Sequence, residues 1–142
     1  MTVTVLPSVI KGQIQAPASK SSMQRACALA LLHKGTTIIT NPGKSNDDLA
    51  ALDIIQKFGA AAEIKNEELI IKNEGAGFSA GKINCGESGL AIRMFTPIAA
   101  LSSNEITITG EGSLLKRPMH FFDEVFPLLG VSIQSNNGYL PV

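Results

Sequence analysis

The sequence predicts an α/β protein with mixed sheets, assembled from two copies of one βαβαββ unit. Strand-like segments alternate with amphipathic helical segments along the chain, which is typical of the α/β class. Each half then closes with two short strand-like runs around a turn, which predicts a hairpin. Arg25 and Arg93, and likewise Gly59 and Gly130, recur at nearly the same spacing, as expected for a duplication.

The first unit is expected to span residues 1–74, with residues 1–11 as an arm that belongs to another half of a larger molecule. In its second helix, Leu49, Leu52 and Ile55 lie at helical spacing and predict the buried face. The expected order is a strand at 12–17, a largely apolar helix at 19–33, a β-branched strand at 36–40, a capped helix at 45–59, and a hairpin of 60–64 with 68–72.

Residues 75–81 are rich in small residues and predict a linker, and residues 82–142 are expected to be the second unit, truncated at its last strand. Pro127 interrupts an amphipathic pattern and predicts a kink or an early helix end. The expected order is a strand at 81–85, a helix at 87–101, a strand at 105–109, a helix at 117–130, and a hairpin of 131–134 with 138–142.

Composition limits the function classes. Of the 142 residues, 44% are hydrophobic and 17% are charged, which is typical of a chain that folds around a core. The net charge is zero and Trp is absent, so the sequence argues against a nucleic-acid or membrane-surface binder. Two cysteines do not indicate a disulfide framework, and no signal peptide or membrane-spanning stretch is visible. We expect a cytoplasmic protein.

The stretch "PASKSSMQR" places Lys20, Ser21 and Arg25 at the start of an apolar helix. Helix N-termini carry unpaired N–H groups and the positive end of the dipole, so they favour anions. The first acid in the chain is Asp47, so these cations have no acidic partner nearby in sequence. A buried Arg25 without a carboxylate is costly, which favours an anionic ligand over a purely structural role.

A second helix start, "GESGLAIR", repeats this arrangement with Gly89 and Arg93 four residues apart. A third basic site is expected where Lys116 and Arg117 precede Pro118, a good first residue for a helix. Together the three sites predict a pocket for small anionic molecules. No His, Cys and Asp cluster has metal-ligand spacing, so no metal site is expected.

Four stretches, "PASKSSMQRA", "TNPGKSNDDLAALDIIQKFGA", "CGESGLAIRMFTPIAAL" and "GEGSLLKRPM", resemble the 5-enolpyruvylshikimate-3-phosphate synthase family. The resemblance implies two globular halves of three βαβαββ units each, so the third unit and nearly all of the second half lie outside this chain. It implies transfer of enolpyruvyl from phosphoenolpyruvate to the 5-hydroxyl of shikimate 3-phosphate. The transfer passes through a tetrahedral intermediate and releases phosphate. The resemblance also implies that no metal or cofactor is needed and that the reaction belongs to aromatic amino-acid biosynthesis.

Carried over by motif, the resemblance implies that Lys20, Ser21 and Arg25 hold shikimate 3-phosphate, and that Lys20, Gly89 and Arg117 hold phosphoenolpyruvate. Arg93, Glu87 and Leu90 would support these contacts. The family often reads Gly-Asn-Ala/Ser-Gly-Thr where this chain has "GESGL". Since Glu87 adds a negative charge and Leu90 replaces a hydroxyl, we expect altered binding of phosphoenolpyruvate and of the inhibitor glyphosate.

The family's catalytic Asp, Lys and Glu lie beyond the matched region, so no catalytic residue is expected here and the chain alone is expected to be inactive. Its parent is expected to be monomeric, whereas this piece would dimerise through exposed apolar surface. Two alternatives stay open. A UDP-N-acetylglucosamine enolpyruvyl transferase would typically read Lys-Asn at Lys20-Ser21 and carry a Cys-bearing loop before its Arg-Pro. The other alternative is a stand-alone module that binds phosphorylated metabolites.

Overall fold

The computed structural model describes residues 2–75, 77–78 and 80–142. Within these residues the chain has mixed α/β structure, as the sequence predicts. The expected linker 75–81 includes residues 76 and 79, which lie outside the described residues. In chain order the elements are α1 Lys20–Leu32, β1 Gly35–Thr40, α2 Asn46–Lys57, β2 Ala61–Lys65, β3 Glu68–Asn73, β4 Lys82–Asn84, α3 Gly89–Ala99, β5 Thr107–Thr109, the 3₁₀ helix η1 Gly112–Lys116, α4 His120–Val125 and the 3₁₀ helix η2 Pro127–Leu129.

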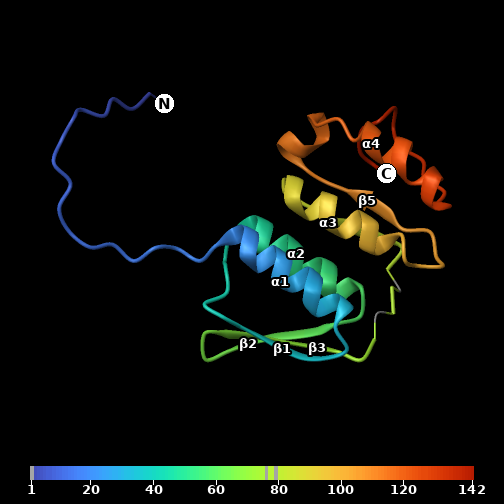
Figure 1. Ribbon diagram of the computed structural model, residues 1–142, viewed down its shortest axis with the longest axis horizontal. Coiled ribbons are helices and arrows are strands. Elements are labelled where there is room, and N and C mark those ends of the chain that lie inside the picture. The colour runs from blue at the N-terminus through green and yellow to red at the C-terminus, as the bar shows by residue number, and fades with distance from the viewer. Residues whose placement is uncertain (1, 76, 79) are drawn as a thin grey trace.

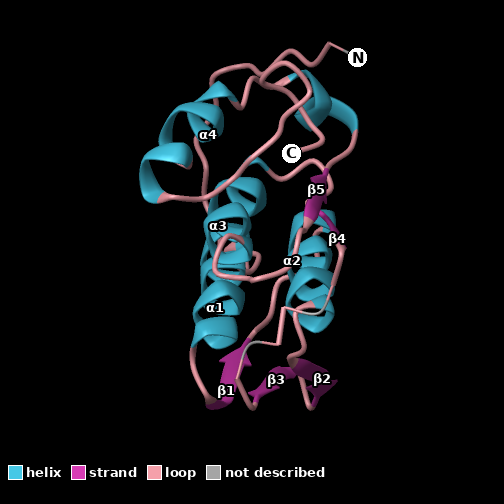
Figure 2. Cartoon of the chain, turned by 90° about the vertical axis from the view of Figure 1, so that its right-hand side faces the viewer, coloured by secondary structure: helices cyan, strands magenta, loops and turns pink. Residues whose placement is uncertain are grey.

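The strands form two separate sheets, and α1, α2 and α3 lie side by side between β1–β3–β2 and α4 (Figures 1 and 2). Strands β1 and β2 both pair antiparallel with the central β3, with Ile38 opposite Ile70. Strands β4 and β5 pair in parallel. Among the described strands, the antiparallel pairs therefore lie in one sheet and the parallel pair lies in the other, whereas mixed sheets were expected.

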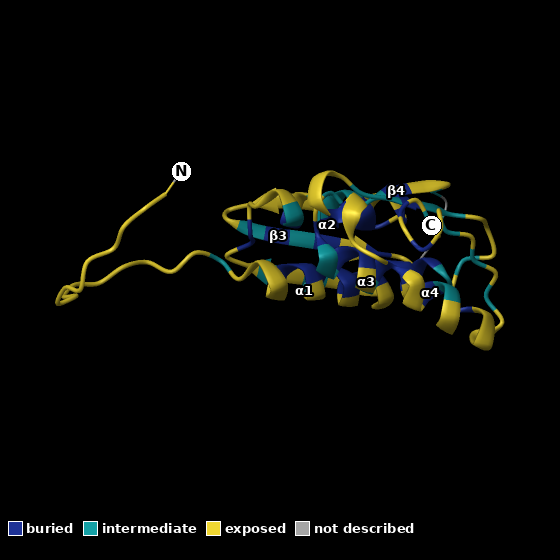
Figure 3. Cartoon of the chain, turned by 90° about the horizontal axis from the view of Figure 1, so that it is seen from above, coloured by how far each residue is buried: buried dark blue, intermediate teal, exposed yellow. Residues whose placement is uncertain are grey.

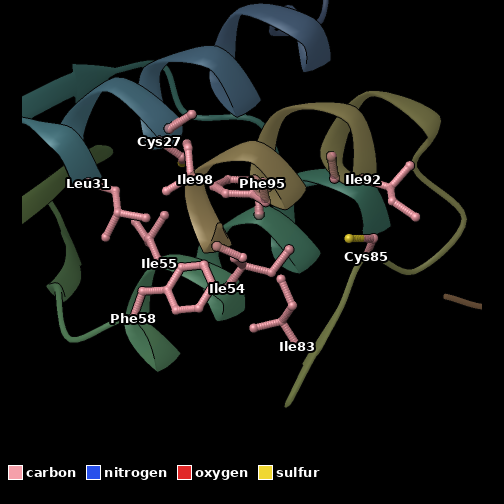
Figure 4. Packing of buried hydrophobic residues seen from close by; sticks show 14 of the residues in the cluster. Cys27, Leu31, Ile54, Ile55, Phe58, Ile83, Cys85, Ile92, Phe95 and Ile98 are labelled. Carbon is pink, nitrogen blue, oxygen red and sulfur yellow. The ribbon is translucent and has the colours of Figure 1, made fainter. Parts of the chain in front are cut away.

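The core lies where the three helices meet each other and the two sheets (Figure 4). On α2 the buried apolar positions are Ala51, Ile54 and Ile55, with Phe58 directly after the helix. The predicted face was partly wrong, because Leu49 is 52% exposed. The other two predicted positions do contact the core, because Ile55 is buried and Leu52 is partly buried against the cluster.

Serine side chains cap the starts of the three long helices. Ser45 begins α2 with a complete capping box, in which its hydroxyl oxygen accepts from the Asp48 N–H while the Asp48 carboxylate accepts from the Ser45 N–H. Ser19 caps α1 and Ser88 caps α3 in the same way, each by accepting from the N–H three residues later. These caps fix the direction in which each helix N-terminus points.

Residues 12–17 do not form the predicted strand. Every residue from 2 to 17 is exposed, and the segment runs away from the body of the molecule as an extended arm (Figure 3). A strand requires a partner for its N–H and C=O groups, and the described chain offers this segment none. Ile14, which the pattern placed in a strand, is 94% exposed.

The C-terminal segment differs from the predicted hairpin as well. Its pairing is one isolated bridge, Asn136 with Tyr139. Val142 instead exchanges two backbone hydrogen bonds with Ile108 on β5, of 2.7 and 3.1 Å. Pro141 lies between these two contacts and has no N–H to donate, which prevents a continuous ladder.

The last helix ends early, as Pro127 predicts. Helix α4 stops at Val125 and the chain continues as the short 3₁₀ helix η2. Leu128 and Leu129 on η2 are 84% and 69% exposed, so apolar surface is open to solvent here. The dimer expected from such a surface stays a prediction. None of the described helices is long and apolar enough to cross a membrane.

Candidate functional site

The N-termini of α1 and α3 border one open pocket of about 440 Å³. The two helices pack against each other. Their first residues, Lys20 and Gly89, both line the pocket, so the positive ends of both helix dipoles lie near the same space. Seven of the eight site residues predicted from the sequence are found in its lining. The lining residues are Lys20, Ser21, Gln24, Asp47, Glu87, Ser88, Gly89, Leu90, Arg93 and Arg117.

On the α1 side, the Lys20 ammonium forms an ion pair with Asp47. The two atoms Lys20 Nζ and Asp47 Oδ2 are 2.8 Å apart. This hydrogen bond, with the added attraction of the carboxylate charge, raises the pKa of Lys20. The partner of Lys20 is thus distant in sequence, and folding brings it close because the first turn of α2 packs beside α1.

On the α3 side, Gly89 leaves room for two guanidinium groups. A Cβ atom added at Gly89 would lie 2.5 Å from Arg117 Nη1 and 3.0 Å from Arg93 Nη1. Any larger residue would push at least the Arg117 guanidinium away from the helix start. The absence of a side chain at Gly89 therefore allows two cations to approach the N-terminal end of the α3 dipole.

Arg25 and Arg93 make matching contacts in the two halves of the chain. Arg25 Nη1 donates to the Ser21 carbonyl at 3.2 Å, and Arg93 Nη1 donates to the Gly89 carbonyl at 2.7 Å. Arg25 is nevertheless exposed and does not line the pocket. The argument from a buried Arg25 was therefore wrong: its side chain lies on the solvent side of α1.

Arg117 reaches the pocket from a different element than expected. It follows the last residue of η1, and its Nη2 donates to Ser113 Oγ at 3.2 Å. Helix α4 begins three residues later, at His120, so the predicted basic helix start at Lys116 and Arg117 was wrong. The 3₁₀ turn places Arg117 over Gly89, while Lys116 is not part of the lining.

Glu87 brings a negative charge to the same pocket. Its Oε2 accepts from the Ser113 N–H at 2.8 Å, and this bond, assisted by the nearby Arg117 charge, lowers the pKa of Glu87. Glu87 and Asp47 also line a neighbouring pocket of about 370 Å³, whose ionisable residues are all acidic: Asp47, Asp53, Glu87 and Glu111. Among the described residues, no group of three His, Cys, Asp or Glu side chains could hold a metal ion.

Three lining residues, Gln24, Asp47 and Ser88, were not identified from the sequence. Gln24 and Ser88 are buried, and the Ser88 hydroxyl donates to Gln24 Oε1 at 2.8 Å. Gln24 lies four residues after Lys20, so helical spacing alone placed it on the same face of α1. No comparable signal pointed to Asp47, which reaches the pocket only through the packing of α2 against α1.

Comparison with known proteins gives one consistent result. A family model described as EPSP synthase (3-phosphoshikimate 1-carboxyvinyltransferase) matches residues 6–142. The chain is 39% identical to a 3-phosphoshikimate 1-carboxyvinyltransferase of Nitrosopumilus maritimus, over 100% of this chain and 34% of that protein. It is 37% identical to one of Methanobrevibacter smithii, over 92% of this chain and 31% of that protein.

Among solved structures, an EPSP synthase from Acinetobacter baumannii superposes with a TM-score of 0.78 at 29% sequence identity. That match covers 92% of this chain and 31% of the other chain. The chain thus spans about a third of the length of the curated relatives that it matches. The fold and the sequence of this chain are both similar to proteins of one group.

Proposed function

The chain belongs to the EPSP synthase (3-phosphoshikimate 1-carboxyvinyltransferase) family, and from this premise we propose that it forms the anion-binding part of such a transferase. The parent reaction is enolpyruvyl transfer from phosphoenolpyruvate to the 5-hydroxyl of shikimate 3-phosphate. The third unit of this half, and the opposing half, would come from outside the 142 residues. The supporting observation is the pocket between α1 and α3, which gathers Lys20, Arg93 and Arg117.

In this proposal, Lys20 contacts both substrates, because it lines the pocket that the two helix starts share. Ser21 and Arg25 hold shikimate 3-phosphate at the start of α1. Arg25 reaches it by exchanging its bond to the Ser21 carbonyl for one to the ligand, which its exposed position allows. Gly89 and Arg117 hold phosphoenolpyruvate, with a guanidinium suited to two-point contact with a carboxylate or phosphate.

The chemistry requires groups that this pocket does not supply. The 5-hydroxyl gives its proton to a base as its oxygen attacks C2 of phosphoenolpyruvate, and C3 takes up a proton from an acid. The resulting tetrahedral intermediate then expels phosphate as C3 loses a proton to a base. Both steps need a positioned acid or base. The ionisable residues lining the pocket are three cations held for binding and two carboxylates, of which Asp47 is paired with Lys20 and Glu87 with the Ser113 N–H. We therefore propose that the chain binds substrate and does not turn it over.

Titration calorimetry of the purified chain with shikimate 3-phosphate tests the binding part of this proposal. We expect saturable binding to wild type and at least tenfold weaker binding to Lys20→Met. Lys57→Met is the matched control, because Lys57 forms an ion pair of 2.7 Å in the last turn of α2 and does not line the pocket. UDP-N-acetylglucosamine is the competing ligand, and preferential binding of it would contradict the proposal.

A phosphate-release assay with both substrates tests the second part. No release above background is expected from the chain alone. Sustained release by the purified 142-residue chain would show that it carries its own acid and base, and the proposed division of roles would fail.

A further inference from the structure

A buried side-chain contact joins the two helices that border the pocket. Gln24 lies in the second turn of α1 and is 0% exposed, while Ser88, the N-cap of α3, is 2% exposed. The Ser88 hydroxyl donates its proton to Gln24 Oε1 at 2.8 Å and accepts from the Ala91 N–H at 3.1 Å. One hydroxyl therefore both caps α3 and attaches its first turn to α1.

This arrangement leaves one polar atom unsatisfied. Gln24 Nε2 is buried and has no hydrogen-bond partner among the residues that the structure describes. A buried donor without a partner destabilises a fold, whereas a methionine of similar volume would fill the same space without that cost. Stability therefore gives no reason for an amide at this position.

The position of the contact relative to the ligand-binding residues supplies a reason. Gln24 lies one turn after Lys20 on the same face of α1, and Ser88 directly precedes Gly89. A ligand that touches both helices needs Lys20 and the turn Gly89–Arg93 at a fixed separation. The hydrogen bond between Gln24 and Ser88 spans the gap between these two groups.

We propose that Gln24 is a positioning residue of the anion pocket: through Ser88 it holds the N-terminus of α3 against α1 and sets the separation between Lys20 and Gly89. This inference rests on the proposed function, since it assumes ligands that bridge the two helices. Misplacement of binding groups by half an ångström or more is enough to weaken such contacts.

The substitution Gln24→Met tests the proposal, because the proposal predicts that the variant keeps its thermal stability and loses binding affinity. The thermal midpoint should equal or exceed that of wild type, since the unsatisfied donor is removed. The Kd for shikimate 3-phosphate should rise about three- to tenfold, the loss expected for one hydrogen bond. Crystal structures of both ligand-free proteins should show a larger Cα separation between Lys20 and Gly89 in the variant.

Two further variants sharpen the test. Ser88→Ala should weaken binding as Gln24→Met does, and the double variant should bind no worse than Ser88→Ala, because the shared hydrogen bond can be lost only once. Gln56→Met is the matched control: Gln56 is exposed on α2, donates to the Ala62 carbonyl and does not line the pocket. It should leave the Kd unchanged.

The outcomes separate the positioning role from other roles. Unchanged binding by Gln24→Met, with or without a loss of stability, overturns it. Weaker binding with an unchanged helix separation also overturns it, since Gln24 would then contact the ligand directly. A wild-type chain that binds no shikimate 3-phosphate contradicts the proposed function. In that case the Cα separation between Lys20 and Gly89, compared between wild type and Gln24→Met, is the measurement that tests the positioning role.

Discussion

Lys20 and Asp47 form an ion pair between α1 and α2 at the edge of the pocket, with 2.8 Å between Nζ and Oδ2. An anion that enters the pocket must compete with Asp47 for the ammonium. Because the pKa of Lys20 is raised, its contribution to stability is complete below the unfolded value of 10.5 and is lost only as the pH rises through the higher folded value. Lys20 therefore stays charged throughout the neutral range.

Removing the competing carboxylate should strengthen anion binding. In Asp47→Asn the ammonium no longer faces a charged partner, and we expect the Kd for shikimate 3-phosphate to fall about two- to fivefold, the range of an exposed ion pair. Calorimetry at low salt measures the change. Asp53→Asn is the control, because Asp53 pairs with Lys57 and lies outside this pocket. Weaker binding by Asp47→Asn would mean that Asp47 holds Lys20 in its binding position.

Filling the space at Gly89 should displace the guanidinium of Arg117. The new methyl of Gly89→Ala would stand 2.5 Å from Arg117 Nη1, the end of a flexible side chain that can move away. We expect at least tenfold weaker phosphoenolpyruvate binding and a nearly unchanged thermal midpoint. In Gly81→Ala a Cβ meets no atom within 4 Å, so that variant should bind as wild type does. Normal binding by Gly89→Ala would remove Arg117 from the proposed ligand set.

Neutralising Glu87 should favour phosphoenolpyruvate. Glu87→Gln keeps an oxygen to accept from Ser113 and removes a negative charge beside Arg117, so we expect about threefold tighter binding at pH 7. The pKa of Glu87 is lowered, so the wild-type carboxylate is charged at neutral pH and stabilises the fold above its unfolded value of 4.5. That stability is lost as the pH falls through the folded value.

The pH dependence gives this prediction its control. The difference in affinity between wild type and Glu87→Gln should stay constant from pH 6 to pH 8, since Glu87 does not titrate there. A difference that changes within this range would show that another group controls the anion affinity.

The two cysteines should be unreactive in the folded chain. Burial raises the pKa of both the Cys27 and Cys85 thiols to about 12, so almost no thiolate is present at pH 8. Ellman's reagent at pH 8 should label neither thiol under native conditions and both in guanidinium chloride. Rapid labelling of either thiol in the native chain would mean that the core around it opens.

The sequence predicted most elements where the signal was local. The capped start of α2, the β-branched strand β1, the hairpin of β2 and β3 and the helix end before Pro127 all depend on residues within one or two turns of each other. The strand expected at 12–17 failed for the opposite reason. Its residues suit a strand, but a strand also needs a neighbouring strand to pair with, and no local sequence pattern indicates which segment that is.

The same distinction applies to the pocket. Lys20, Ser21 and Gly89 were singled out because charged and small residues at helix starts suggest anion binding in any fold. Arg117 was singled out at a helix start that the structure does not show, and it lines the pocket from the end of η1 instead. Asp47 and the contact between Gln24 and Ser88 were missed because they depend on how α1 packs against α2 and α3. The sequence separates Gln24 from Ser88 by 64 residues, and only the folded chain brings the two side chains together.

The exposed arm has a consequence for how unfolding is measured. Residues 2–17 are already in water in the folded chain, so denaturation uncovers little new surface there. Both the denaturant m-value and the heat-capacity change scale with newly exposed surface. Each should be smaller than the length of 142 residues suggests, and deleting the arm should leave both nearly unchanged. The part of the chain that unfolds cooperatively in calorimetry therefore begins near α1.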